Sequence, residues 1–324
     1  MRTNAAPRYD VRDGLPRDAH TSDFRQAVLD GLSAHPKQLS PKYFYDEEGA
    51  RLFEAITKLP EYYPTRTEMH ILNENGAALA EAIPPNATVV EFGSGSSRKF
   101  RALLHARPDI AAYVSVDISA AFLNAEARQL RRDFPALAVV PVAGDFTQPF
   151  DLPQFVARRR VGFFPGSTIG NFEPEMAASF LRHARNILGK SILIIGVDLP
   201  KDPARLEAAY DDAQGVTAAF NLNLLRRINR ELDGTFDLEA FKHVALYNAD
   251  CGRIEMHLES TRAQTVHVGA KAFAFIEGER IHTENSYKHS VEGFQALATM
   301  NGWTPSKVLT DSEALFSVHI LHAD

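Results

Sequence analysis

Two glycines and two acidic residues occur where apolar runs of this sequence end, and their types and spacing suit a nucleotide-like ligand. Gly93 and Gly95 follow Glu91 in the segment VVEFGSGSSRKF, residues 89–100. A glycine-rich turn at the end of a strand lets backbone N–H groups approach a ligand closely. Asp117 ends the next apolar run, about 20 residues further on, which is the interval expected for a carboxylate that accepts from ribose hydroxyls. The sequence therefore predicts a cofactor site here.

A third acidic residue, Asp145, ends another apolar run and is followed by Phe146. Its carboxylate could accept from an adenine amino group while the Phe146 ring covers the base. A dinucleotide-binding G-x-G-x-x-G turn needs a third glycine, but this sequence has Arg98 at that position. Together these features resemble those of class I S-adenosylmethionine (SAM)-dependent methyltransferases, and an NAD-dependent oxidoreductase is the less favoured alternative on the same fold.

The elements that must position these residues follow a regular pattern between residues 88 and 197. Near-continuous apolar runs separated by helix-like segments are typical of buried parallel strands with crossover helices. We expect strands at 88–92, 113–118, 138–142, 161–164 and 191–197, and helices at 98–106, 119–133 and 173–188. The sequence therefore predicts an α/β fold, a doubly wound Rossmann-like sheet.

The pattern changes on both sides of this region. Upstream, helices are expected at 21–34, 47–58 and 65–82, and downstream one long helical region covers 202–230 with a possible break near Gly215. The runs at 243–247, 253–259, 265–268 and 272–275 alternate polar with apolar residues, as in an antiparallel sheet with one wet face. A helix near 291–300 and strands at 306–309 and 316–321 could rejoin the parallel sheet.

Longer segments make the resemblance more specific. They are YFYDEEGARLFEAITKLPEYYPTRTE (43–68), GSTIGNFEP (166–174), the stretch 198–248, RIEMHL (253–258) and TENSYK (283–288). From about residue 21 to the end, the chain resembles the L-histidine Nα-methyltransferases of ergothioneine biosynthesis. This family converts histidine to hercynine by three methylations of the α-amine, each of which releases S-adenosyl-L-homocysteine.

The resemblance implies two interleaved domains. Residues 66–199 and 288–324 would form the SAM-binding methyltransferase core, and residues 21–65 and 200–287 a second, α+β substrate-binding domain. Residues 1–20 are polar and contain prolines, so we expect a mobile tail there.

The resemblance also implies roles for individual residues. The implied SAM contacts are Tyr45, Gly93, Lys99, Asp117, Asp145 and Phe146. The implied substrate contacts are Tyr62, Asn171 and Tyr210 for the amino and carboxylate ends, Thr168 in the same loop as Asn171, Glu284 and Ser286 for the imidazole, and Phe53 and Met256 as pocket walls. Tyr62 and Asn171 are the implied catalytic residues.

These residue types suit methyl transfer to an amine. The amine must be neutral and its lone pair must point at the methyl group, so the carbonyl of Asn171 could accept an N–H away from the reaction line. None of the implied residues is a strong base, which favours positioning over general-base catalysis. Glu284 could accept an N–H from the imidazole, and Ser286 could serve the other nitrogen as donor or acceptor. If residues 283–286 are extended, the two side chains share one face.

Several alternatives stay open at this point. Tyr62 could be ordinary packing, Met256 a core residue, Glu284 a surface carboxylate and Ser286 a turn residue. The substrate could be another amino acid or aromatic amine such as tryptophan, although an indole offers a buried carboxylate only one N–H. A non-catalytic binding module is a further alternative. Tyr287, His289 and Pro165 depart from the residues expected there, which affects the predicted shape of the pocket.

Composition excludes several other classes. The chain has 324 residues, a net charge of −6 and one cysteine, Cys251, so an intramolecular disulfide framework and a cysteine-based zinc site are excluded. The 12 histidines show no metal-ligand spacing, so no metal is expected. The negative charge disfavours nucleic-acid binding, and no apolar run approaches the roughly 20 residues that span a membrane. With no secretory signal at the start, we expect a cytoplasmic protein that acts as a monomer on a small molecule.

Overall fold

A seven-stranded sheet forms the larger half of the molecule. The computed structural model describes residues 17–148, 150, 152 and 159–324; most of the expected tail at 1–20 lies outside them, and the first helix begins at Arg17. The strand order of the large sheet is β12-β13-β6-β5-β2-β3-β4. Its parallel strands are β2 (Thr88–Phe92), β3 (Ala112–Asp117), β4 (Ala138–Ala143), β5 (Arg160–Phe164) and β6 (Ser191–Asp198). Antiparallel β13 (Phe316–Ala323) and β12 (Thr304–Thr310) complete it.

Helices cover both faces of this sheet, which confirms the predicted doubly wound fold. On one face lie α3 (Tyr63–Glu74), α4 (Gly76–Ala82), α5 (Arg98–Ala106) and α6 (Ala120–Asp133), and on the other lie α7 (Pro174–Leu188) and α10 (Val291–Met300). Every residue of β6 is buried, as its unbroken apolar run requires. The strand order reverses at β2, so the carboxyl ends of β2 and its neighbours border the position where ligands bind in such sheets.

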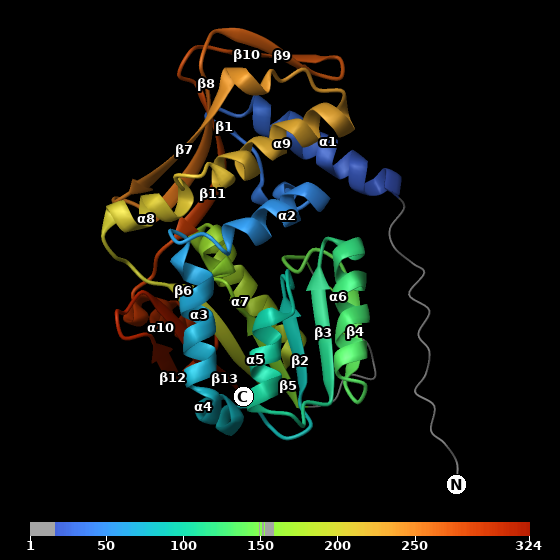
Figure 1. Ribbon diagram of the computed structural model, residues 1–324, viewed down its shortest axis with the longest axis vertical. Helices are drawn as coiled ribbons and strands as arrows, with labels where there is room; N and C mark the ends of the chain where they lie inside the picture. Colours follow the sequence, from blue (N-terminus) through green and yellow to red (C-terminus); the bar gives the residue numbers. More distant parts are fainter. Residues whose placement is uncertain (1–16, 149, 151, 153–158) are drawn as a thin grey trace.

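A second, four-stranded sheet has the order β1-β11-β8-β7. Its strands are β1 (Lys37–Gln38), β7 (Phe241–Asn248), β8 (Arg253–Ser260) and β11 (Arg280–Tyr287), and β9 (Gln264–Val268) pairs with β10 (Lys271–Phe275) in a separate ribbon. The helices α1 (Arg17–Ser33), α2 (Glu47–Ile56), α8 (Pro203–Tyr210) and α9 (Val216–Leu232) pack with these strands around one core. Figure 1 shows this part at the end of the molecule toward which the parallel strands point.

Two expected helices are interrupted in the structure. The region expected at 202–230 is divided into α8 and α9, with Gly215 in the left-handed conformation at φ +72° just before α9. The helix expected at 65–82 is divided at Asn75 into α3 and α4. Within the described residues, no helix has both the length and the apolar character needed to cross a membrane.

One glycine sets how closely the two halves approach each other. Gly170 lies in the short 3-10 helix η2 (Thr168–Asn171), which follows β5 and packs against β11. A Cβ atom at Gly170 would lie 2.7 Å from the backbone oxygen of Tyr287, and neither backbone can give way cheaply. Only glycine therefore allows this packing of η2.

We predict that Gly170→Ala lowers the free energy of unfolding by about 1–3 kcal/mol, because the two backbones must separate. Thermal unfolding measures the change. Gly76→Ala is the matched control: its nearest neighbour would be the Ala106 Cβ at 3.8 Å, so stability should stay equal or rise. Equal destabilisation of the two variants would contradict this account of Gly170.

Candidate active site

A cavity of about 780 Å³ lies between the carboxyl edge of the large sheet and the four-stranded sheet. Thirteen of the residues expected at the site line it. They are Tyr45, Phe53, Tyr62, Gly93, Lys99, Asp117, Asp145, Phe146, Thr168, Asn171, Tyr210, Glu284 and Ser286. Met256 is not among the lining residues; it is 2% exposed in the neighbouring core, directly across from Glu284 in the strand register. One cavity thus brings together residues that lie far apart in the sequence.

The loop after β2 gives the cavity its glycine-lined end. Gly93 has φ +70°, and a Cβ atom there would lie 3.2 Å from the Phe146 ring. The Phe146 ring therefore packs against a turn whose conformation and limited space favour glycine, and both residues line the cavity. The Gly93 N–H donates to the Val116 carbonyl at 2.9 Å, which ties the loop to β3.

The two aspartates at this end each use one oxygen within their own turn. Asp117 accepts from the Ser119 N–H at 2.9 Å, and Asp145 accepts from the Thr147 N–H at 2.9 Å. The second oxygen of Asp145 lies 3.7 Å from the Lys42 ammonium. Burial raises the pKa of Asp117 to about 6, although the backbone N–H donors oppose this. Both carboxylates line the cavity while they cap their turns, and the second oxygen of Asp145 has no role in its turn.

A buried glutamate that sequence reasoning missed anchors Lys99, one of the cationic residues that line the cavity. Glu68 is 1% exposed and accepts at 2.6 Å from the Lys99 ammonium. The same carboxylate accepts from the Gly166 N–H at 2.9 and 3.0 Å. Lys99 is thereby fixed at the cavity wall, where its remaining N–H groups suit a carboxylate ligand. Glu68 closes the TRTE sequence already noted, but nothing local to that sequence indicates its distant partners.

A second buried carboxylate, Glu91, lies beneath the loop. It accepts from the Tyr113 hydroxyl at 2.5 Å, and burial raises the pKa of its carboxyl to about 8. The Tyr113 hydroxyl in turn lies 2.8 Å from the Ser94 hydroxyl, so this network links β2, β3 and the glycine loop. Glu91 lines the cavity as well, which places a neutral carboxyl group at its base near neutral pH.

The opposite end of the cavity carries aromatic and polar side chains from the smaller half. The rings of Tyr62 and Tyr210 pack edge to face, with 6.1 Å between their centroids. The Tyr210 hydroxyl lies 2.7 Å from the Ser286 hydroxyl. Glu284 and Ser286 lie on β11, opposite Met256 and Ile254 of β8, so they share the inner face of the sheet as their spacing predicts.

Glu284 is 9% exposed. Burial raises the pKa of its carboxyl to about 8, and the Lys288 ammonium opposes this only in part. A carboxyl group with that pKa holds its proton at neutral pH until a ligand with a suitable donor or acceptor arrives. Burial also raises the pKa values of the Tyr62 and Tyr210 hydroxyls, so both stay protonated and can donate.

Glu173, at the start of α7, joins the two halves, and both Glu173 and its partner Asn285 line the cavity. Its carboxylate accepts from Asn285 at 2.8 Å, from the Tyr287 hydroxyl at 2.5 Å and from Arg253 at 3.0 Å. The first two donors lie on β11 and the third on β8. Tyr287, which departs from the residue expected there, therefore points to this contact on the outer face of the sheet, away from Glu284. We refer to Glu173 and its three donors as the Glu173 clasp.

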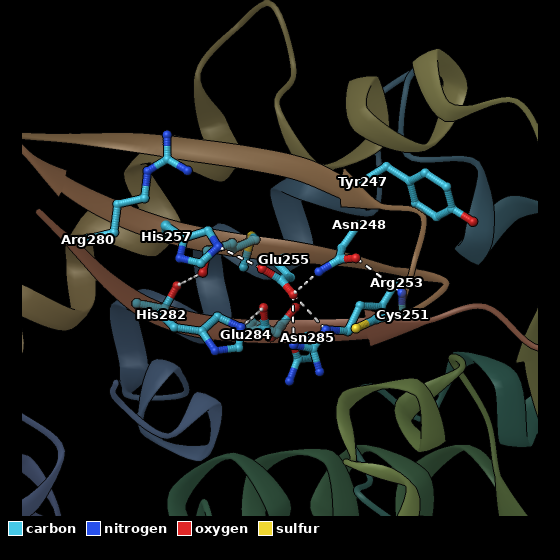
Figure 2. A network of polar contacts seen from close by, with 12 residues as sticks. Tyr247, Asn248, Cys251, Arg253, Glu255, His257, Arg280, His282, Glu284 and Asn285 are labelled. Atoms are coloured by element: carbon cyan, nitrogen blue, oxygen red, sulfur yellow. Dashed lines mark hydrogen bonds and ion pairs between the residues drawn. The ribbon is translucent and has the colours of Figure 1, made fainter. Parts of the chain in front are cut away.

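A polar network occupies the same outer face further along β8 and β11 (Figure 2). Within the described residues, ligand atoms of Glu255, His257 and His282 lie within 4.8 Å of one another, a spacing that a metal ion could use. However, the Glu255 carboxylate already accepts from Arg253 at 2.8 Å, Asn248 at 3.0 Å and His257 at 3.1 Å. The cationic Arg253 neutralises the only anionic member of the group, so we assign these residues a structural role.

Comparison with known proteins identifies the family. A model described as "Histidine-specific methyltransferase, SAM-dependent" matches residues 24–323. The chain belongs to this family. A histidine N-alpha-methyltransferase of Mycolicibacterium smegmatis is 42% identical and covers 94% of this chain and 97% of its own length. That of Mycobacterium tuberculosis is 41% identical, and the match covers 97% of this chain and 99% of the relative. A 4-dimethylallyltryptophan N-methyltransferase of Claviceps purpurea is 26% identical and covers 95% and 96%.

Membership of this family makes the protein a SAM-dependent methyltransferase and removes the NAD-dependent alternative. The residues at the glycine-lined end of the cavity fit that cofactor. Phe146 offers an aromatic surface to the adenine ring, the carboxylates of Asp117 and Asp145 suit hydroxyl and amino donors, and Lys99 suits a carboxylate.

We predict that Glu173→Ala raises the KM for the amino-acid substrate several-fold and leaves the affinity for S-adenosylhomocysteine within about twofold, because the clasp holds β11 but does not touch the glycine loop. Its carboxylate is half-exposed, so the loss of stability should be about 1 kcal/mol. Steady-state kinetics, calorimetric titration and thermal unfolding measure the three effects.

Glu175→Ala is the matched control for the clasp, since Glu175 is exposed in the same first turn of α7 and carries the same charge. It should leave the substrate KM unchanged. If both variants raise the KM equally, the loss of negative charge at the start of α7 causes the rise, and the contacts of the Glu173 clasp do not.

Proposed function

We propose that this protein transfers three methyl groups in turn from SAM to the α-amine of L-histidine and so produces hercynine, the first step of ergothioneine biosynthesis. The observation that carries the proposal is the arrangement of the cavity: residues suited to SAM line one end, and the buried pair Glu284 and Ser286 lines the other. Relatives at 41–42% identity that carry the histidine N-alpha-methyltransferase name support it.

At the cofactor end, Asp117 would accept from the ribose hydroxyls and Asp145 from the adenine amino group, with Phe146 over the base. Lys99, held by Glu68, would bind the carboxylate, and Tyr45 and Gly93 would complete the contacts. The bound cofactor supplies a methyl group on a positively charged sulfur. The task left to the protein is to present a neutral amine in line with that methyl group.

At the amino end, Asn171 would accept one N–H of the amine and so turn its lone pair toward the methyl group. The hydroxyls of Tyr62 and Tyr210 have raised pKa values, so they serve as donors to the substrate carboxylate. No side chain in this group is a base strong enough to remove a proton from an ammonium. Solvent or a water chain must therefore take the proton, and positioning supplies the catalysis. Thr168 and Phe53 would complete the pocket wall.

At the side-chain end, Glu284 and the imidazole would share one proton. At neutral pH the empty site holds that proton on Glu284, whose pKa is about 8, and free histidine has a neutral imidazole. The complex needs no change in proton number in this range. A buried site built on such hydrogen bonds rejects ligands that leave its groups unpaired, often by large factors.

Methylation of tryptophan or of a related aromatic amine is the second candidate, favoured by the similarity to the Claviceps enzyme. An indole has a single N–H and no ring acceptor, so one of the two polar groups at Glu284 and Ser286 would stay unpaired. An unpaired buried polar group costs about 1–3 kcal/mol. The pair therefore favours histidine. That the enzyme is a monomer located in the cytoplasm remains a prediction.

We predict that mass spectrometry of histidine incubated with the enzyme and SAM detects one, two and finally three added methyl groups. Tryptophan offered in the same reaction provides the competing substrate. Faster turnover of tryptophan than of histidine would contradict the proposal, as would a reaction that stops after one methyl group.

We also predict that the KM for histidine is lowest between about pH 6.5 and 8. Below this window the imidazole takes up a proton that the complex must release, and above it Glu284 loses the proton that the complex needs, so affinity falls on both sides. Glu284→Gln should raise the KM about tenfold or more at pH 7.5, because its amide can still form a neutral hydrogen bond but cannot share a proton with the imidazole, and such neutral hydrogen bonds are weaker. Its amide does not ionise, so the rise caused by Glu284 above pH 8 should disappear.

Steady-state kinetics from pH 6 to 9 for the natural protein and Glu284→Gln measure both effects. Titration with S-adenosylhomocysteine serves as the control, since its affinity should be the same in the two proteins. An unchanged KM and pH profile in Glu284→Gln would exclude imidazole recognition by this residue.

A further inference from the structure

A buried lysine that the proposed mechanism does not use lies directly behind the substrate-facing hydroxyls. The side chain of Lys288 is 0% exposed. Its ammonium donates to the Ser286 hydroxyl at 2.7 Å and to the Tyr210 hydroxyl at 3.2 Å, and lies 2.7 Å from the Asp198 carboxylate. An ammonium has three N–H groups and accepts nothing, so these three oxygens use its whole capacity.

The Lys288 ammonium restricts what the two hydroxyls can do. Ser286 and Tyr210 share a hydrogen bond of 2.7 Å, which uses the proton of one hydroxyl and a lone pair of the other. Lys288 occupies a further lone pair on each oxygen. One hydroxyl proton is then left for the substrate. The hydroxyl that donates it is the one that accepts both from Lys288 and from the other hydroxyl.

We propose that Lys288 is a positioning residue that couples recognition of the two ends of the amino acid through Tyr210 and Ser286. When Tyr210 donates to the substrate carboxylate, Ser286 must donate to Tyr210, and its remaining lone pair can only accept. The imidazole then presents an N–H to Ser286 and its other nitrogen to Glu284. This inference rests on the proposed function and settles the role of Ser286, which its chemistry alone leaves open between donor and acceptor.

The surroundings of Lys288 provide a matched control within the chain. Lys201 pairs with the same Asp198 carboxylate at the same distance of 2.7 Å, and its side chain is 7% exposed. Its other partners are the Tyr63 hydroxyl and the Leu199 carbonyl, neither of which is one of the two coupled hydroxyls. Replacing either lysine leaves Asp198 with one ammonium partner, so the buried carboxylate keeps its compensation in both variants.

The test compares Lys288→Met with Lys201→Met. We expect both to lower the thermal unfolding temperature and to keep the affinity for S-adenosylhomocysteine within about twofold. Lys288→Met alone should raise the KM for histidine about tenfold or more, with a smaller change in kcat, whereas Lys201→Met should keep the KM within about twofold. Lys288→Gln is close in size to the methionine variant but retains N–H donors, so it should recover part of the loss.

A double-mutant cycle tests whether Lys288 acts through Ser286. Lys288→Met should raise the KM by less than about threefold when Ser286 is already alanine, because the hydroxyl it orients is gone. An equal effect of Lys288→Met with and without Ser286, or an equal effect of the two lysine variants, would overturn the proposal. The natural protein in the same assay separates the two claims: absence of histidine methylation there contradicts the proposed function, and methylation with equivalent lysine variants contradicts only the role of Lys288.

Discussion

The carboxylate of Asp198 is the point on which the two halves of the molecule depend. It is 1% exposed at the carboxyl end of β6 and accepts from the Tyr63 hydroxyl at 2.7 Å, while Lys201 and Lys288 each lie 2.7 Å away. Burial alone would raise the pKa of Asp198, but the two ammonium groups outweigh it and hold the pKa below its ordinary value. The carboxylate therefore stays charged, and the low dielectric of its surroundings strengthens each contact.

The three partners of Asp198 come from the three places where the chain passes between the two halves. Tyr63 belongs to the core under the four-stranded sheet, whereas Ile71, further along the same helix, belongs to the core under the large sheet. Lys201 follows β6 where the chain leaves the large sheet, and Lys288 follows β11 where it returns. The Asp198 N–H also donates to the Ser167 hydroxyl at 2.9 Å, just before η2. The loop that carries Asn171 and the strand that carries Glu284 are thus positioned relative to one residue.

Local signals in the sequence predict the cofactor end of the site better than its substrate end. The glycine turn and Asp145 follow strands of five and six residues, and Asp117 ends another, so a short stretch of sequence contains both the element and the functional group. The supporting residues Glu68, Glu173 and Lys288 act on partners from other elements, and no short segment shows such pairs. The strand β11 is buried on both faces from Thr283 to Tyr287, although most of these residues are polar. Its sequence therefore lacks the polar–apolar alternation that would predict a strand. Met256 matches the family pattern, yet its side chain lies in the core, on the strand beside Glu284, and does not line the cavity.

The two buried glutamates of the cavity show why recognition depends on unpaired hydrogen-bonding capacity more than on shape. Burial raises the pKa of both Glu91 and Glu284 to about 8, so both are neutral carboxyl groups near neutral pH. Glu91 already has a short hydrogen bond from Tyr113, and its role is complete without a ligand. For Glu284, no comparable donor from the described residues contributes to the pKa; its only opposing influence is the charge of Lys288. A ligand with a ring nitrogen gives the buried Glu284 carboxyl a hydrogen-bond partner that the fold does not supply. An apolar ring of the same size would leave that carboxyl without one. The specificity of this end of the cavity therefore originates in the free-energy cost of burying Glu284 without a hydrogen-bond partner, which a ligand with a ring nitrogen removes.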